Sequence, residues 1–229
     1  MKVRCSNGLH AVDYDGNFFQ HKPTEIEFGT IDADKAVVVK FKHEGKLDRK
    51  LDVVFQSALL YTTASGERRI RVQNMAARPT NDIIEIFKTA DEDAIMVTVA
   101  KEASFKMLTK TSREVREGVG DKCIRILAAY RKYQGSGALH GQLILPDKLR
   151  LLPLYTLTLL KCRAFRGLSV SLNIADFAGG RVSSDMRIHS LRLLRGFGAT
   201  DLIAYLYPRI FSLHTMSDKV FIPLFNTKF

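Results

Sequence analysis

Hydrophobic and polar residues alternate along the first third of the chain, as they do in β-strands. One such stretch, residues 36–42, places three apolar residues on one face and Lys40 and Lys42 on the other, which predicts a strand with one solvated face. Residues 53–63 and 68–75 are joined by a four-residue loop, which predicts a hairpin. Because the first arm of this hairpin is apolar on both faces, we expect a central strand buried from both sides.

The chain opens on a further short alternating strand, residues 2–6, closed by an Asn-Gly turn signal at Asn7 and Gly8. A strand needs hydrogen-bonding neighbours on both edges, and unpaired edges invite association with other molecules. We therefore expect that some neighbours of this strand lie outside these residues.

After Pro79 the hydrophobic period changes from two to about 3.6, which is the period of an α-helix. Thr80 or Asn81 is positioned to cap a first helix. The acidic residues 91–93 mark the start of a second, where the helix dipole favours negative charge, and a third begins at Ser112.

Two features divide the rest of the chain. Pro153 has no amide hydrogen, so we expect a kink or break near Leu152 in the helix that begins at Pro146. Residues 163–183 are rich in Gly and Ser and predict a loop, after which Ser184 caps an amphipathic helix that stops at Gly196.

These elements predict an α+β fold: a partial antiparallel β-sandwich followed by an all-α helical domain. We expect the β-sandwich domain at residues 1–79, the helical domain at 80–212 and a divergent C-terminal tail at 213–229.

The net charge of +11 is concentrated in the last part of the chain. Residues 146–229 carry 12 basic and five acidic residues, whereas residues 80–145 carry ten and nine. A basic excess at one end implies a polyanionic partner, either phosphate headgroups of a membrane or nucleic acid.

No motif in the sequence predicts catalysis, a cofactor or a metal. Three widely spaced cysteines form no CxxC pair, and the GxGxxG, GxxxxGK[ST], GxSxG and HExxH patterns are absent. Residues 13–17 share two carboxylates before a glycine with calcium loops but lack the glutamate at the twelfth position, so we interpret them as a turn between strands. We expect a non-enzymatic protein.

Two groups of basic residues are candidate contacts with an anionic surface: Lys40, Lys42, Arg69 and Arg71 on the predicted strands, and Arg187, Arg192 and Arg195 on the predicted last helix. The strand group forms a cationic grid if its two strands are neighbours. On the helix, Ile188, Leu191 and Leu194 form one apolar stripe beside the arginines. The alternative for both groups is a merely solvated face.

Motifs spread over residues 1–212 resemble, in order and spacing, one stretch of the cargo-adaptor subunit of the COPII inner coat. The matching segments are Met1–Gly8, Asp13–Phe18, Pro23–Thr24, Ile31–Lys35, Ser57–Thr63, Gly66–Val72, Ala128–Lys132, Gly141–Pro146, Leu151–Tyr155 and Tyr207–Arg209. Such a collinear series is far more specific than any one of its motifs.

The resemblance implies a β-sandwich followed by a helical domain, and a non-catalytic coat protein that selects cargo for ER-to-Golgi transport. The family's zinc-finger, trunk and gelsolin-like domains have no counterpart in these residues, so we expect a truncated homologue. The partners it implies are the coat's GTPase-activating subunit, cargo and SNARE sorting signals, and the anionic surface of the endoplasmic reticulum membrane, where the protein is peripheral.

Residues 163–181 and the segment after His214 depart from the family pattern. The family's cargo pockets do not transfer residue by residue, so no cargo site is assigned. The alternative function is a basic module that binds nucleic acid or anionic membranes without a coat role. No recognition helix, RNP motif or Trp is present, and we expect no specific nucleic acid.

Overall fold

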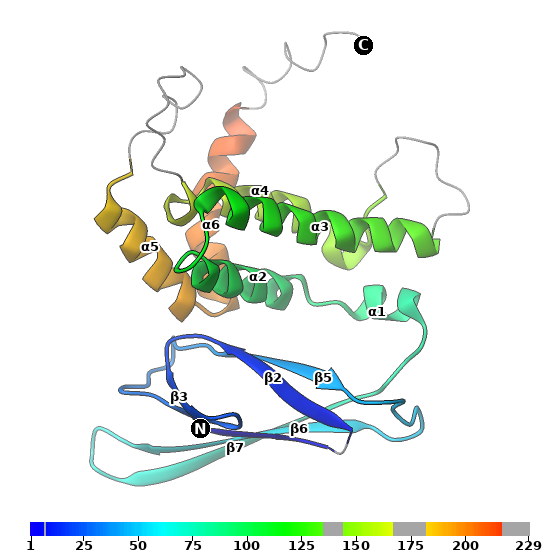
Figure 1. Ribbon diagram of the computed structural model, residues 1–229, viewed down its shortest axis with the longest axis vertical. Coiled ribbons are helices and arrows are strands. Elements are labelled where there is room, and N and C mark those ends of the chain that lie inside the picture. The colour runs from blue at the N-terminus through cyan, green and yellow to red at the C-terminus, as the bar shows by residue number, and fades with distance from the viewer. Residues whose placement is uncertain (7, 135–143, 167–181, 217–229) are drawn as a thin grey trace. The chain divides into compact units, whose positions relative to one another are not determined.

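The computed structural model describes residues 1–6, 8–134, 144–166 and 182–216. The chain forms two compact units, Met1–Ile86 and Phe87–Phe229. The first contains the strands and the second most of the helices (Figure 1). The domain bounds drawn from the sequence stay predictions.

The β unit is a sandwich of two antiparallel sheets (Figure 1). Five strands form one sheet in the order β3-β4-β1-β6-β7, and β2 pairs with β5 in the other. The strands are β1 (Lys2–Cys5), β2 (Leu9–Asp15), β3 (Phe19–Lys22), β4 (Glu25–Glu27), β5 (Val38–His43), β6 (Val53–Thr62) and β7 (Arg68–Ala77). The predicted antiparallel β-sandwich is confirmed.

The first strand is paired on both edges. β1 lies between β4 and β6, with Val3 opposite Ser57 of β6 and Lys2 opposite Glu25 of β4. The expectation that neighbours of this strand are missing is therefore wrong. Among the described residues, the strands with one neighbour are β2, β3, β5 and β7.

The predicted hairpin is present as β6 and β7, which pair along ten positions from Val53–Ala77 to Thr62–Arg68. Gly66 in the connecting loop has a φ of 87°, a conformation that favours glycine. β6 is central in its sheet but is not buried from both sides, because Val54 and Leu60 are 43% and 52% exposed. No described residue covers that face of the strand well enough to bury them.

The core of the β unit is small. Val3, Tyr14 and Ile26 are its buried apolar residues, and the inward face of β5 packs against them through Val39 and Phe41. The predicted alternation in residues 36–42 therefore separates a core face from a face that carries Lys40 and Lys42.

The helical unit follows the predicted change of period. The boundary between the two units falls within the first helix, α1 (Ile83–Thr89). The remaining helical segments are α2 (Glu92–Lys106), α3 (Ser112–Gln134), η1 (Asp147–Leu149), α4 (Leu152–Lys161), η2 (Arg163–Phe165), α5 (Ser184–Gly196) and α6 (Ala199–Met216), where η denotes a 3-10 turn. Helices α2, α3 and α4 run alongside one another, and α5 and α6 pack against this layer (Figure 1).

The caps of these helices lie close to their predicted positions. The predicted acidic start of the second helix is present, because α2 begins at Glu92, and Asp91 caps it by accepting a hydrogen bond from the Ala94 amide. Asp82, not Thr80 or Asn81, accepts from an amide in the first turn of α1. Ser183, one residue before the predicted cap, caps α5 by accepting from the Met186 amide at 3.1 Å. A serine side chain caps only from the residue that precedes the first helical turn.

The predicted break near Leu152 is confirmed. The 3-10 turn η1 ends at Leu149, and α4 begins at Leu152 with Pro153 in its first turn. Proline is tolerated there because the first amides of a helix have no partner within the helix. Two consecutive segments consequently replace one straight helix.

The helical unit has an extensive core drawn from all its long helices. Its fully buried side chains include Met96, Leu159, Phe165, Leu194 and Leu206. None of the described helices combines the length and the apolar character that a bilayer crossing requires.

Candidate anionic-surface contacts

The two strand pairs of candidate cations do not come together on one face of a sheet. β5 pairs with β2 and β7 pairs with β6, so the strands belong to different sheets. Arg71 lines the space between the sheets, whereas Lys40 lies on the opposite face of β5 from Val39 and Phe41, which line that space. The predicted grid of four cations is therefore wrong, because it requires neighbouring strands.

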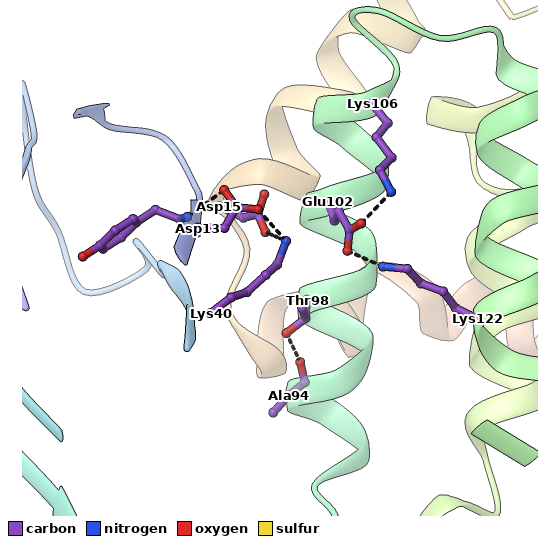
Figure 2. A network of polar contacts seen from close by, with 9 residues as sticks. Asp13, Asp15, Lys40, Ala94, Thr98, Glu102, Lys106 and Lys122 are labelled. Carbon is purple, nitrogen blue, oxygen red and sulfur yellow. Dashed lines mark hydrogen bonds and ion pairs between the residues drawn. The ribbon is translucent and has the colours of Figure 1, made fainter. Parts of the chain in front are cut away.

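Lys40 is neutralised by two carboxylates of the adjacent strand. Its Nζ lies 2.9 Å from Oδ2 of Asp13 and 2.7 Å from Oδ2 of Asp15 (Figure 2). Asp13 and Asp15 belong to β2, so the predicted turn at residues 13–17 is wrong for its first three residues, whereas Gly16 and Asn17 form a bend between β2 and β3. Asp15 is buried, and a buried carboxylate requires a compensating cation. Lys40 meets this requirement, which makes it a structural residue.

Two other strand cations differ in their pairing. Arg69 forms an ion pair with Glu67 of the hairpin loop. Lys42 is exposed on β5, and its side chain forms no hydrogen bond or ion pair with the described residues. Of the two, Lys42 keeps its full charge for a partner.

The helix group lies on α5, and its three arginines differ in burial. Arg192 is exposed, whereas Arg187 and Arg195 are half-buried. The predicted apolar stripe is only partly correct: Leu194 is buried, but Ile188 is 48% exposed and Ser190 is buried in its place. The helix is rotated so that residues 190 and 194, four apart, face the core.

Arg195 is held by α2 rather than presented to solvent. Its guanidinium lies 4.7 Å from the centre of the Phe105 ring and donates a hydrogen bond to the Ser104 carbonyl at 3.2 Å. Burial, with a smaller contribution from the Arg192 charge, lowers the pKa of Arg195 below its usual value. The buried Lys101 of α2 also donates to the Arg195 carbonyl at 2.5 Å.

Lys101 was not among the residues that the sequence patterns single out. It is fully buried, and its ammonium binds a carbonyl in the last turn of α5, where the helix dipole favours a cation. The available signal was a lysine that directly follows the largely apolar stretch 94–100 of a helix. Lys106 and Lys122 likewise converge on Glu102 at the surface between α2 and α3 (Figure 2).

The described residues contain no cluster of three or more His, Cys, Asp or Glu side chains that fits a metal ion. The cysteines, Cys5, Cys123 and Cys162, are free thiols. The structure thus offers cationic surface positions, of which Lys42, Arg71 and Arg192 are the most available. That the seven predicted cations contact an anionic surface stays a prediction.

Two family models match the chain in tandem. The Sec23/Sec24 beta-sandwich domain matches residues 1–80, and the Sec23/Sec24 helical domain matches residues 91–204. The chain belongs to the Sec23/Sec24 family.

Within this family the chain is similar to Sec24 proteins. It is 39% identical to protein transport protein SEC24 B of Arabidopsis thaliana over 94% of the chain, and 33% identical to human Sec24D over 96%. The crystal structure of the human COPII-coat protein Sec24c superimposes with a TM-score of 0.78 at 32% identity, over 90% of the chain and 26% of that protein. The chain spans about a fifth of the length of these curated relatives, 18% and 20% respectively.

Proposed function

We propose that this chain supplies the β-sandwich and helical portions of a COPII cargo-adaptor subunit, in a non-catalytic role in transport from the endoplasmic reticulum to the Golgi. The observation that carries the proposal is the tandem match of both domains, in one order, to Sec23/Sec24. Similarity to a COPII-coat protein, Sec24c, over 90% of the chain supports it.

The proposed partners follow from the family. They are the GTPase-activating subunit of the coat, cargo and SNARE sorting signals, and the anionic endoplasmic reticulum membrane on which the protein is peripheral. The relatives are named protein transport proteins, which is consistent with these partners.

A segment exchange tests the coat role. Residues 1–216 replace the matching segment of human Sec24D, to which the chain is 33% identical. We expect the chimera to be recruited to endoplasmic reticulum membranes and to support vesicle formation in a reconstituted budding reaction. The control chimera carries Phe165→Asp, which places a charge in a fully buried position. A folded chimera that is never recruited contradicts the proposal.

The membrane contact is tested separately by flotation of the 229-residue chain with liposomes. We expect binding to vesicles with anionic lipid and release as the salt concentration rises, because exposed charges are screened beyond about 10 Å at 0.1 M salt. Arg192→Glu, which reverses an exposed charge, weakens binding, and Arg163→Glu in η2 serves as the comparison outside the candidate set. Vesicle binding that does not change with salt concentration contradicts the electrostatic contact.

The alternative, a basic nucleic-acid-binding module, rests on the net charge of +11. Gel shifts with duplex DNA and single-stranded RNA at the salt of the flotation assay decide between the two. Affinity for nucleic acid above that for anionic vesicles favours the alternative.

A further inference from the structure

A groove with a volume of about 530 Å³ follows the line along which α2 and α3 lie side by side (Figure 1). Its walls include Ala94, Ile95 and Thr98 of α2 and Lys122, Arg125 and Ile126 of α3. Both walls belong to the helical unit, and the same two helices bury Met96 and Val119 in the core of that unit. The groove is therefore built by one folded unit.

The groove continues along the same two helices. A second, smaller depression of about 70 Å³ is lined in part by Lys106 of α2 and Gly118 of α3, and it shares Val99 and Lys122 with the first. The two depressions together form the α2–α3 seam. Along α2 the seam extends from Ala94 to Lys106, a distance of about 18 Å at the helical rise of about 1.5 Å per residue.

The walls of the seam select the secondary structure of a partner. In the interiors of α2 and α3 the backbone N–H and C=O groups are hydrogen-bonded within the helices, so the walls offer side chains alone. The hydroxyl of Thr98 is also satisfied, because it donates to the Ala94 carbonyl at 2.8 Å (Figure 2). An extended segment would bury backbone groups without partners on such walls, whereas an α-helix brings a backbone that is already hydrogen-bonded.

The first depression of the seam suits apolar side chains. Ile95 and Ile126 are half-buried and line it together with the buried Val99. Ala94 and Thr98, four residues apart on α2, are small, so they leave room for larger side chains of a docked helix. A helix with apolar residues at alternating three- and four-residue spacing presents such a row of side chains.

The second depression carries a net positive charge. The carboxylate of Glu102 accepts from both Lys106 and Lys122, so one negative charge faces two ammonium groups (Figure 2). Lys110 and Glu114 also line this depression, and their opposite charges cancel. The lining residues therefore carry one positive charge more than they carry negative charges.

Arg125 adds a cation to the first depression. It is exposed, its Nε donates to the Asp121 carbonyl of its own helix at 3.3 Å, and its side chain forms no ion pair with the described residues. No acidic residue is among those that line the first depression. Carboxylates on a partner helix would therefore meet uncompensated positive charge in both depressions.

We propose that the α2–α3 seam binds an amphipathic α-helix of another polypeptide, about 12 residues long, through an apolar face that covers Ile95 and Ile126. Acidic residues beside that face lie opposite Arg125 in the first depression and opposite Lys122 in the second. This interaction is separate from the coat role proposed above.

The probe is a fluorescein-labelled peptide, Glu-Leu-Ala-Gln-Leu-Glu-Ala-Glu-Leu-Ala-Gln-Leu-Glu-Ala, whose leucines share one helix face with glutamates on both sides of it. Its binding to the 229-residue chain is followed by fluorescence anisotropy. We expect saturable binding, with about a tenfold preference over the peptide in which Lys replaces every Glu, the combined effect of a few exposed ion pairs. A peptide with proline at the central alanine cannot form a continuous helix and does not bind.

Substitutions in the seam separate charge from shape. Arg125→Glu is expected to weaken binding of the Glu peptide about tenfold, because it replaces an attraction with a repulsion. Arg113→Glu changes the net charge of α3 by the same amount, but Arg113 lines neither depression, so this control leaves the affinity within about twofold. Both positions are exposed, and circular dichroism verifies that both variants are folded. Ala94→Trp, at an exposed wall position, fills the first depression without changing a charge and abolishes binding.

The same peptide is measured with the Sec24D chimera, in which residues 1–216 lie within a full-length coat subunit. Saturable binding is expected there as well, and the assay contains no membrane, so its outcome is independent of recruitment. Absence of saturable binding to the chain or to the chimera, equal affinity for the Glu and Lys peptides, or equal effects of Arg125→Glu and Arg113→Glu overturns the proposal.

Discussion

The β unit and the helical unit bury very different amounts of apolar side chain. Among the described residues, three apolar residues of the β unit are buried, against 18 in the helical unit. Burial of apolar surface is the main favourable contribution to folding, at about 25 cal/mol per Å². The difference indicates that the helical unit sustains its own fold, whereas the β unit relies on a small core and its strand pairing.

The exposed apolar residues sharpen this contrast. In the β unit, Val54, Leu60, Ile70 and Val72 share one face of the β6–β7 hairpin and are all exposed. Apolar residues in neighbouring strand positions form a continuous surface, unlike scattered single exposures. The hairpin therefore carries a continuous apolar patch that no described residue buries.

The largest predicted effect is a core truncation in the helical unit. Phe165 is fully buried, and Phe165→Ala lowers the free energy of unfolding by about 3–5 kcal/mol because it removes the ring and leaves a cavity. The matched change in the β unit, Phe19→Ala, removes a side chain that is 64% exposed and costs less than about 1 kcal/mol. Urea denaturation followed by circular dichroism measures both. Equal decreases in the free energy of unfolding for the two variants would contradict the difference in core burial between the units.

Lys101→Met is expected to lower the free energy of unfolding by less than Phe165→Ala does. The variant keeps the apolar stem but removes the ammonium that donates to the Arg195 carbonyl, and a hydrogen bond involving a charged group contributes about 1.5–3 kcal/mol. Lys148→Met, at an exposed lysine of η1, is the control and is nearly neutral. A helical unit of unchanged stability in Lys101→Met would show that the buried ammonium is not compensated by α5.

Two glutamates at helix starts predict pH effects of opposite sign. Burial raises the pKa of Glu92 in α2 above 4.5, so its ionisation opposes folding as the pH rises through that range. Hydrogen bonds from the side chain and backbone amide of Thr111 lower the pKa of Glu114 in α3, so its charge stabilises the fold until the pH falls below about 4.5.

At pH 7 we therefore expect Glu92→Gln to raise the denaturation midpoint and Glu114→Gln to lower it. Both differences shrink toward zero as the pH is lowered below the normal range of glutamate, because the wild-type carboxyls are then protonated. Thermal denaturation between pH 3 and pH 7 measures the trend. Shifts of the same sign in the two variants would show that a common helix-dipole effect dominates.

The smallest expected change in stability is that of Ile70→Lys. Ile70 is 70% exposed on β7, so the free energy of unfolding changes by less than about 0.5 kcal/mol. A charge on an edge strand opposes intermolecular pairing, and light scattering is expected to show a higher concentration threshold for aggregation than in Ile70→Val. An unchanged threshold would mean that this face does not drive association.

The sequence alone was sufficient for features set by local pattern. The alternation around Lys40, the hairpin of β6 and β7, and the acidic start of α2 at residues 91–93 all depend on neighbouring residues, and all three are present. The break before Pro153 follows in the same way from the missing amide hydrogen.

Features set by the packing of distant segments were not predictable. The outer face of β6 is as apolar as its inner face, so only the sheet order shows that Leu60 is exposed. The pairing of Lys40 with Asp13 and Asp15 depends on the register of β2 and β5. Arg192 is exposed and Arg195 contacts α2 because of how α5 is rotated about its axis against α2. The hydrophobic period of the sequence does not determine that rotation.

The reciprocal contacts of Arg195 also bear on the order of events in folding. Lys101 donates a hydrogen bond to the carbonyl of Arg195, 94 residues away in the sequence, and the guanidinium of Arg195 donates to the carbonyl of Ser104, 91 residues away. Closing so long a loop costs conformational entropy before the contact contributes any stabilising free energy, so such contacts form after the local helices. Stopped-flow measurements on Lys101→Met should then show faster unfolding with an unchanged folding rate, which means that α5 docks after the rate-limiting step.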